Sequence, residues 1–339
     1  MSVLLTRDII TIGGSSGSIG VLKRILADLP SDLPASVLIT THIASQSAGF
    51  MGEMLMERSN LPVEQAVDRQ AIERGHVYVA PPDRHLLIVD GVIRLGDGPR
   101  ENMARPAVDA LFRSAALSFG PRVIGVVLSG LLNDGAAGLH AVKACGGLTV
   151  VQHPLDAEAD AMPLAALETT AVDHVATGAE MGALLARIAG TRAGPGQPPS
   201  DELRLEVEIA AGARLGSANL RRLAEPSPLS CPDCGGVLSE LRSARPLRFR
   251  CQIGHAYTAD VLVAHSDKVD EAIRVAMRIM EERVTLVERM AADARDTGRQ
   301  AVAELYAARS AEYRRYATTL RDAALSSSRL GKRKPEQND

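Results

Sequence analysis

The sequence predicts an α/β protein with a doubly wound, mainly parallel sheet, followed by a small Cys/His ribbon and an α-helical hairpin. Short β-branched runs alternate with helical patterns from residue 8 to about residue 190, as in a doubly wound fold. Runs such as VIGVVLSG are apolar throughout, as expected for strands buried on both faces of a parallel sheet. After residue 258, apolar residues recur at steps of three and four, which indicates amphipathic helices.

The alternating segments can be assigned in order. We expect strands at Ile9–Gly13, Val37–Thr41, Val77–Ala80, Val123–Ser129 and Leu148–Gln152, and a short one beginning at His174. We expect helices at Ile19–Leu29, Gly49–Arg58, Pro106–Phe119, Ala136–Ala144, Pro163–Glu168 and Met181–Ile188. The runs His85–Val89 and Val92–Leu95 flank Asp90-Gly91, a dipeptide typical of hairpin turns, and predict an inserted hairpin.

The Pro/Gly-rich stretch TRAGPGQPPS predicts a boundary between domains. Leu203–Ile209 beyond it is predicted to be a strand, and Asp296-Thr-Gly298 to be the turn of a helix pair. The predicted organisation is an α/β domain at 1–190, a linker at 191–202 and a ribbon-like β segment at 203–257. A helical hairpin at 258–326 and a disordered tail at 327–339 are predicted to follow.

Composition excludes several classes of function. The net charge of −3, the absence of tryptophan and an aromatic content of 3% argue against nucleic-acid binding. No apolar run approaches the roughly 20 residues of a membrane-spanning helix, so we expect no membrane insertion. The N-terminus lacks the features of a signal peptide, and four cysteines are too few for a disulfide scaffold. We therefore expect a cytoplasmic protein.

The stretch IGGSSGS lies between the first predicted strand and helix. Its glycines do not have the spacing of a dinucleotide-binding or phosphate-binding loop, and no tyrosine is followed by lysine four residues later, which argues against a nucleotide-dependent oxidoreductase. Gly13-x-Ser15-x-Gly17 instead fits a G-x-S-x-G turn, which exposes a serine nucleophile at the carboxyl edge of a sheet. The alternative is a tight turn that only caps a helix.

A nucleophilic serine needs a base and a residue that orients the base. His42 follows the run VLITT, and Asp134 follows VIGVVLS. Both are therefore expected at the sheet edge that carries Ser15. His153 also ends a predicted strand and is the competing base. By position alone, a histidine at the end of a strand is more often an ordinary polar residue of a loop.

Six segments in order resemble the catalytic domain of CheB, the chemotaxis protein-glutamate methylesterase: IGGSSGS, TTHIAS, GHVYVAPPDRHLLI, RPAVDALF, GVVLSGLLNDGAAG and AMPLAA. The resemblance covers about residues 8–190 and identifies Ser15, His42 and Asp134 as the catalytic triad. It implies hydrolysis of glutamyl γ-methyl esters on chemoreceptors, often with deamidation of glutamine, and without a cofactor in catalysis.

The resemblance has further implications. Backbone N–H groups at Ser16 and in the loop at Leu131 are expected to bind the oxyanion. Arg105 and Asp109 either line the cleft or form ion pairs at the start of a helix. The family commonly has glycine where Leu132 stands, so we expect a changed loop beside Asp134.

Family members in chemotaxis usually carry a receiver domain, whereas this sequence begins at the first catalytic strand. We therefore expect no control by phosphorylation in cis. The alternative to an esterase is a non-catalytic signalling scaffold with the same fold.

Cys231-Pro-Asp-Cys234 is followed by Cys251-x₃-His255. Three thiolates and one imidazole complete a tetrahedral zinc site with no position open for substrate, so we expect a structural zinc. The alternative is a reduced, metal-free ribbon. Cys145 is expected to be buried and inert.

The helical region after residue 258 has one apolar stripe, formed by Val269, Ile273, Ala276, Met280, Val284 and Val287. This stripe is predicted to mediate self-association or partner binding, or to pack on the ribbon of the same chain.

Overall fold

The computed structural model describes residues 5–42, 50–242, 245–264 and 267–330. The chain forms two compact units, Met1–Val261 and Leu262–Asp339. The first contains a seven-stranded sheet, a four-stranded sheet and a two-stranded hairpin. The second contains the two long helices of the C-terminal region.

The seven-stranded sheet has the order β3-β4-β2-β1-β7-β8-β9, and all neighbouring strands in it pair in parallel. The inner strands are buried along nearly their whole length, because helices cover both faces. The strands are β1 (Ile9–Gly14), β2 (Ser36–Thr41), β3 (Val63–Gln65), β4 (Val77–Val79), β7 (Val123–Val127), β8 (Leu148–Gln152) and β9 (His174–Ala176).

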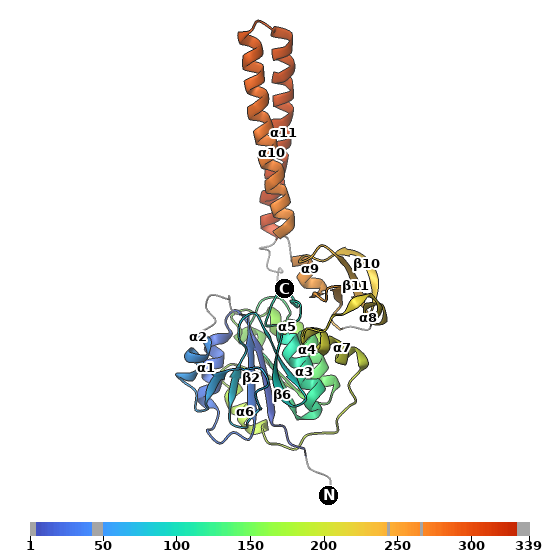
Figure 1. Ribbon diagram of the computed structural model, residues 1–339. Helices are drawn as coiled ribbons and strands as arrows, with labels where there is room; N and C mark the ends of the chain where they lie inside the picture. Colours follow the sequence, from blue (N-terminus) through green and yellow to red (C-terminus); the bar gives the residue numbers. More distant parts are fainter. Residues whose placement is uncertain (1–4, 43–49, 243–244, 265–266, 331–339) are drawn as a thin grey trace, which may run out of the picture. The chain divides into compact units, whose positions relative to one another are not determined.

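Helices α1, α2 and α6 cover one face of this sheet, and α3, α4 and α5 cover the other (Figure 1). Each face of the sheet has its own apolar core: the first lies under α1, α2 and α6, and the second under α3, α4 and α5. Because side chains alternate along β1, Ile10 and Ile12 lie in the first core and Ile9 lies in the second. The helices are α1 (Ser18–Asp28), α2 (Phe50–Met56), α3 (Val108–Phe119), α4 (Ala136–Ala144), α5 (Ala161–Thr169) and α6 (Met181–Ile188), with 3-10 turns at Gly120–Arg122 and Pro154–Asp156.

Strand β1 lies at the point where the strand order reverses. The chain runs from β1 to β2 on one side, whereas β7, β8 and β9 lie on the other side. In open parallel sheets, ligands bind in the crevice at the carboxyl ends of the strands at such a reversal. The segments that follow β1, β2 and β7 therefore meet where a site is expected.

The predicted fold class is confirmed, and the predicted elements of the α/β region agree with the structure within one to three residues at most ends. The inserted hairpin is present as β5 (His85–Val89) and β6 (Val92–Gly96). It packs on α3 in the second core. The short edge strand β3 was not predicted, because two of its three residues are polar and exposed.

The prediction of a strand at Leu203–Ile209 is wrong, because this segment lies in helix α7 (Asp201–Ala210). The Ser200 hydroxyl caps the helix by accepting the N–H of Leu203 at 3.1 Å. Leu203, Val207 and Ala210 are buried, at steps of four and three that suit one face of a helix. The apparent alternation at 203–209 coincides with this helical pattern over a short segment.

A small ribbon follows α7 and α8 (Gly216–Leu223). Its antiparallel strands have the order β10-β11-β12-β13 and are β10 (Ala224–Ser230), β11 (Val237–Leu241), β12 (Arg248–Cys251) and β13 (Ala256–Thr258). Helix α9 (Ala259–Ala264) continues from β13. An apolar cluster that includes Ile209, Leu220 and Leu241 joins the ribbon to α7 and α8.

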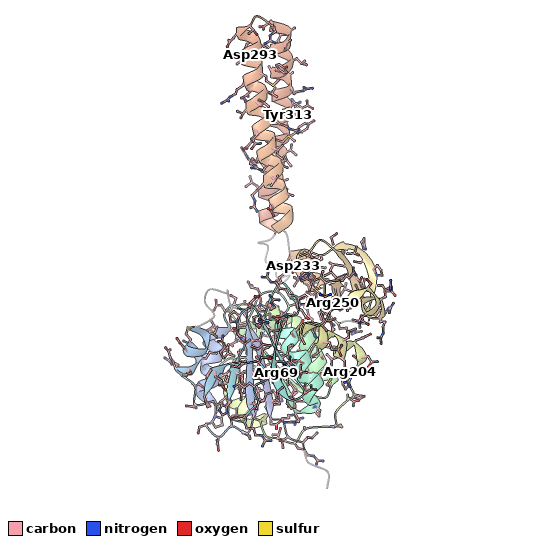
Figure 2. The ribbon with its side chains drawn as sticks, viewed as in Figure 1. Arg69, Arg204, Asp233, Arg250, Asp293 and Tyr313 are labelled. Carbon is pink, nitrogen blue, oxygen red and sulfur yellow. The ribbon has the colours of Figure 1, made fainter. Side chains whose placement is uncertain are left out.

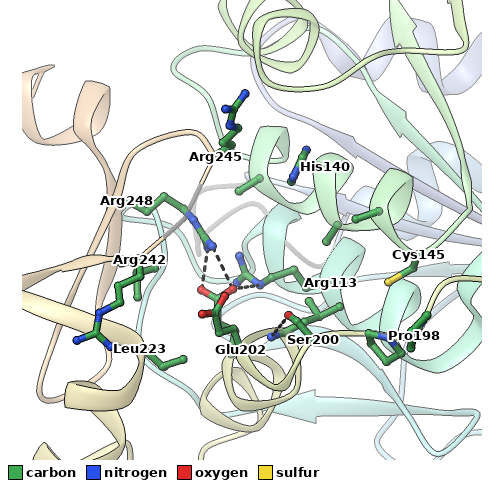
Figure 3. A pocket seen from close by; sticks show the side chains of 17 residues that line it. Arg113, His140, Cys145, Pro198, Ser200, Glu202, Leu223, Arg242, Arg245 and Arg248 are labelled. Atoms are coloured by element: carbon green, nitrogen blue, oxygen red, sulfur yellow. Dashed lines mark hydrogen bonds and ion pairs between the residues drawn. The ribbon is translucent and has the colours of Figure 1, made fainter.

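A buried ionic cluster joins the ribbon to the α/β domain. Arg250 of β12 is fully buried and donates to Glu101 at 3.3 Å and to Glu206 at 3.2 Å. Arg248 makes two hydrogen bonds to Glu206, at 2.8 and 3.1 Å, and Arg113 of α3 is paired with Glu101. Arg113 Nε also lies 3.8 Å from Glu206 Oε2, so Arg113 and Arg248, both labelled in Figure 3, pair with Glu206. Each buried charge is thus paired, as the cost of desolvation requires.

The second unit is a pair of antiparallel helices, α10 (Asp267–Asp296) and α11 (Gln300–Leu330), joined at the predicted turn. Val287 and Ala291 of α10 and Ala303 of α11 are buried in it. Glu281 is paired with Arg321 at 2.7 Å, and Glu288 is paired with Arg314. Of the predicted tail, residues 327–330 are helical and residues 331–339 lie outside the described residues.

Within the residues that the structure describes, no helix combines the length and the apolar character needed to cross a bilayer.

Candidate active site and Cys/His cluster

Ser15 stands directly after β1, in the turn that leads into α1. Its N–H donates to Ser129 O at 2.9 Å, and its carbonyl accepts the Ser18 hydroxyl at 2.7 Å. Gly17 completes the turn with a φ of 77°, and a Cβ there would lie 2.7 Å from Ser129 Oγ. Only glycine meets both conditions, so the glycine of this motif fixes how the chain presents Ser15.

His42 stands directly after β2, the neighbouring strand. Gly14 and Thr41 are paired across the two strands, and the His42 N–H donates to Gly14 O at 3.3 Å. Ser15 and His42 therefore follow adjacent positions at one sheet edge. The His42 side chain is 23% exposed, so a substrate can reach it.

Asp134 lies in the loop between β7 and α4 and accepts a hydrogen bond from His42, with 2.6 Å between His42 Nε2 and Asp134 Oδ2. Asp134 Oδ2 also accepts the N–H of Val108 at 2.7 Å, and Oδ1 accepts the N–H of Asp109 at 3.2 Å. These are the first two N–H groups of α3, so the carboxylate sits at the positive end of a helix.

The surroundings of His42 and Asp134 favour the charged form of each side chain. Burial opposes ionisation of Asp134, but its hydrogen bond to His42, the charge of His42 and the N–H donors of α3 outweigh burial and lower its pKa. Burial also opposes protonation of His42, but the hydrogen bond and negative charge of Asp134 prevail and raise the His42 pKa above its ordinary value.

Asp109 is fully buried beside this pair. Burial, together with the charge of Asp134, raises the pKa of Asp109 to about 7. Its Oδ1 accepts the N–H of Gly138 at 2.6 Å. Arg105 makes two hydrogen bonds to Asp83, at 2.8 and 3.0 Å. Both residues are thus committed to polar contacts within the domain, as expected if they form a network at the start of a helix.

The serine hydroxyl is not yet engaged with the histidine. Among the described residues, Ser15 Oγ makes no hydrogen bond, and residues 43–49, which directly follow His42, lie outside them. Catalytic hydrogen bonds are often loose in ligand-free enzymes and tighten in the substrate complex. His42 Nδ1 is the ring nitrogen that remains for Ser15, because Nε2 is bonded to Asp134.

Two N–H groups near Ser15 are candidates for binding an oxyanion. The N–H of Gly130 is occupied, because it donates to Ala159 O at 3.0 Å. Within the described part of the chain, the N–H groups of Ser16 and Leu131 donate to no acceptor. Leu132 has a φ of 60°, so this loop adopts a left-handed turn even though the commonly expected glycine is absent, at a cost of about 1–2 kcal/mol.

The alternative base, His153, lies farther from Ser15 in the sheet. It follows β8, which is separated from β1 by β7. It is exposed, and its Nδ1 accepts the N–H of Leu155 at 3.2 Å. His153 therefore caps a short 3-10 turn.

A cavity of about 250 Å³ lies between the α/β domain, α7 and the ribbon. His140, Glu202 and Arg245 are among its lining residues (Figure 3). Neither Ser15, His42 nor Asp134 lines it, so this cavity is distinct from the candidate active site.

Cys231, Cys234, Cys251 and His255 form a second cluster, called the Cys/His cluster below. Their ligand atoms all lie within 4.8 Å of one another. The Cys234 and Cys251 sulfurs are 3.7 Å apart, and His255 Nδ1 lies 3.5 Å from the Cys251 sulfur and 3.7 Å from the Cys231 sulfur. Tetrahedral zinc requires about 3.8 Å between sulfurs and about 3.6 Å between sulfur and nitrogen, from its usual bond lengths. The cluster could therefore bind a metal ion.

Backbone hydrogen bonds close the two turns that carry the cysteines. The Gly235 N–H donates to Cys231 O at 2.9 Å, and the Gly254 N–H donates to Cys251 O at 3.0 Å. His255 Nε2 lies 3.9 Å from Asp233 Oδ2, and the Tyr257 hydroxyl donates to Asp233 at 2.7 Å. Such outer contacts orient metal ligands. Cys145 lies outside this cluster and is buried, and burial raises the pKa of its thiol.

Sequence reasoning missed the polar residues that support Asp134. Asn102 Nδ2 donates to Asp134 Oδ1 at 3.2 Å, and Asn133 bonds to Thr258 and Asp260. Asn133 could have been noticed as the neighbour of Asp134. Asn102 and Thr258 carry no motif, because their roles depend on segments that are far apart in the sequence.

Known proteins are similar to the α/β region. The family model described as CheB methylesterase matches residues 10–185. A protein of Leptospira interrogans is 42% identical over 167 residues, which cover 49% of this chain and 86% of the relative. Proteins named protein-glutamate methylesterase/protein-glutamine glutaminase in Anaeromyxobacter dehalogenans and Hydrogenovibrio crunogenus are 38% and 39% identical. The matches cover 50% and 49% of this chain but only 49% and 45% of those two proteins.

One solved structure has the same fold. The crystal structure of the Thermotoga maritima CheB methylesterase catalytic domain matches with a TM-score of 0.52 and 28% identity, over 55% of this chain and 100% of that domain. The match therefore concerns the α/β domain, and the ribbon and helical hairpin are additional to it.

Proposed function

Because this chain belongs to the CheB methylesterase family, we propose that it is a serine esterase that hydrolyses glutamyl γ-methyl esters on chemoreceptor-like proteins and also deamidates glutamine. The observation that carries the proposal is the 2.6 Å His42–Asp134 hydrogen bond beside Ser15, at the reversal of strand order. The names of the Anaeromyxobacter and Hydrogenovibrio relatives support the same substrate class. No comparable observation favours the non-catalytic scaffold.

Ser15, His42 and Asp134 have the roles of a catalytic triad in this proposal. His42 Nδ1 takes the hydroxyl proton as Ser15 Oγ attacks the ester carbonyl. Asp134 accepts the other ring N–H, which fixes the tautomer and stabilises the imidazolium. The N–H groups of Ser16 and Leu131 bind the oxyanion.

The tetrahedral intermediate then collapses. The bond from carbon to the methoxy oxygen breaks, His42 returns the proton to that oxygen, and methanol leaves a glutamyl-serine ester. Water, deprotonated by His42, hydrolyses this ester and regenerates Ser15. Deamidation follows the same course with ammonia as the leaving group. The chain supplies the nucleophile, the base and the oxyanion donors, so the steps require no cofactor.

The experiment that tests the function is methanol release from methylated receptor fragments. We expect wild type and His153→Ala to release methanol, and His42→Ala to lose activity, because triad members act as a unit. Activity should rise with pH through the His42 pKa, which the Asp134 carboxylate raises above its ordinary value, because only the neutral imidazole accepts a proton. An inactive His153→Ala with an active His42→Ala would assign the base to His153.

We further propose that the Cys/His cluster holds a structural Zn²⁺, because the four ligands leave no position for substrate. Zinc would fix the two turns of the ribbon and offset the repulsion between neighbouring thiolates. A zinc-thiolate site needs reduced cysteines, which fits a cytoplasmic protein.

Protein purified without chelator is expected to contain one Zn²⁺ per chain by elemental analysis. Cys231→Ser and Cys251→Ser should lower the zinc content and make residues 225–256 more sensitive to protease, because each removes a ligand. Cys145→Ser is the matched control and should retain zinc. Fully reduced wild type with no bound metal would contradict this assignment.

Self-association through the helical hairpin stays a prediction. Of the predicted apolar stripe, Val287 is buried within the helix pair. Other apolar residues of α10 that lie outside the stripe are exposed, among them Val275, Ile279, Leu286 and Met290, and an apolar helix face of this kind could meet another copy of the chain.

A further inference from the structure

We propose that the ribbon positions the catalytic aspartate, so that metal loading of the Cys/His cluster and the orientation of Asp134 depend on each other through Asn102. This inference rests on the proposed function, because it concerns the same active site. It makes Asn102 a positioning residue, which acts on the reaction through Asp134.

The first step of the link is a backbone pairing between the ribbon and the α/β domain. Strand β13 begins at Ala256, directly after the metal-ligating candidate His255. Ala256 O accepts the N–H of Asn102 at 2.8 Å, and the Ala256 N–H donates to Arg100 O at 3.3 Å. Residues 100–102 thus lie beside β13 like an added strand, with a parallel bridge at Glu101.

The second step is the Asn102 amide, which connects the ribbon to the triad. Its Oδ1 accepts the N–H of Thr258 at 3.1 Å. Its Nδ2 donates to Asp134 Oδ1 and Asp109 Oδ2, both at 3.2 Å. The amide has only one sensible orientation, because a backbone N–H must face the oxygen and a carboxylate must face the NH₂ group. Displacement of Thr258 would therefore withdraw a donor from Asp134.

A parallel contact holds the residue next to Asp134. The Thr258 hydroxyl donates to Asn133 Oδ1 at 2.7 Å, and Asn133 Nδ2 donates to Asp260 at 2.7 Å. Thr258 is fully buried, so no solvent is at hand to replace its hydrogen bonds. The ribbon and the start of α9 thus fix the loop of Asp134 from two directions.

The turn between Cys251 and His255 is connected, through the Arg250 side chain, to the segment of the α/β domain that contains Asn102. Arg250, labelled in Figure 2, precedes Cys251 and donates to Gly254 O at 2.7 Å, inside the turn between Cys251 and His255. The same side chain donates to Glu101, the neighbour of Asn102. A metal that fixes this turn therefore sets both the Arg250 side chain and the start of β13.

The supported segment is not in a relaxed conformation. Asn102 has a φ of 48° and Met103 a φ of 66°, in the left-handed region that residues other than glycine seldom adopt. Such a conformation persists where surrounding contacts hold it, and β13 supplies several of these contacts. Coupling between two sites is reciprocal. If a bound metal helps to order Asp134, an ordered Asp134 must therefore favour metal binding.

The test compares Asn102→Gly with Met103→Gly in the full chain loaded with Zn²⁺. Glycine suits the left-handed backbone at both positions, and only Asn102→Gly removes the amide. We expect Asn102→Gly to lower kcat for a small methyl ester roughly 10-fold, with little change in KM, through loss of one hydrogen bond to a charged group. The His42 pKa measured by NMR should also fall, because Asp134 would keep its backbone donors but lose the side-chain donor that helps to hold it in line with His42. Met103→Gly should match wild type in both measurements.

Chelation of zinc provides the second arm. It should lower the His42 pKa in wild type and in Met103→Gly, and clearly less in Asn102→Gly, where only the Thr258–Asn133 contact still joins the ribbon to the loop of Asp134. An equal response to chelation in all three proteins, or wild-type kcat and His42 pKa in zinc-loaded Asn102→Gly, would overturn the proposal. If the zinc-free chain unfolds, the zinc-loaded comparison decides. The pKa measurement needs no turnover, so absence of methanol release would count against the proposed function alone.

Discussion

Ser15→Ala is expected to reduce methanol release by roughly 10⁴-fold to 10⁶-fold, which is the usual consequence of removing a catalytic serine. The variant lacks only the hydroxyl, whereas the Ser15 N–H bond to Ser129 O and the carbonyl bond from Ser18 remain. The turn should therefore keep its shape, and the far-ultraviolet circular dichroism and unfolding midpoint should stay close to those of wild type.

The matched control is Ser31→Ala. Ser31 is an exposed residue of the turn between α1 and β2, at the opposite edge of the sheet from Ser15. This variant should retain full methanol release. Residual activity of Ser15→Ala within 10-fold of wild type would show that another group attacks the ester, and the triad assignment would have to be abandoned.

Asp134→Asn is expected to lower kcat by about 10⁴-fold, because an amide presents a donor to His42 Nε2 and favours the wrong tautomer. The substitution nearly conserves volume, but it places an NH₂ group against the N–H donors of α3 or against His42. Steady-state kinetics on the same methyl ester measure the loss. The control is Asp90→Asn in the exposed turn of the β5–β6 hairpin, where asparagine before glycine is equally favourable.

The same variant should shift the pH profile in a defined direction. Burial lowers the pKa of His42, and Asp134 outweighs burial in wild type. Without the negative charge, burial prevails, so the remaining activity should appear at lower pH than in wild type. The pKa of Asp109 should fall as well, because the Asp134 charge contributes to its rise to about 7. An unchanged His42 pKa would contradict the pairing seen between His42 and Asp134.

The residues of the candidate site were largely predictable, because each stands at the end of a segment with its own local signal. The buried runs before Ser15, His42 and Asp134 identify parallel strands, and the carboxyl ends of parallel strands meet at one edge. Local signals also predicted the grouping of the Cys/His cluster, because its ligands come from two short turns, Cys231-x₂-Cys234 and Cys251-x₃-His255. The same reasoning failed at 203–209, where seven residues are too few to separate a two-residue period from a helical one.

The sequence by itself determined the α/β architecture, the edge that carries Ser15, and the chemical types of the two polar constellations. These depend on periodicity and on residues within a few positions of each other. Only the tertiary structure decided that His42 rather than His153 is bonded to a carboxylate, that α3 directs its N–H groups at Asp134, and that Asn102 joins Asp134 to Thr258. The last of these contacts spans 156 positions in the chain. The energy of a hydrogen bond depends on burial and on angstrom-scale distances, and these are fixed only when the whole domain and its ribbon have packed.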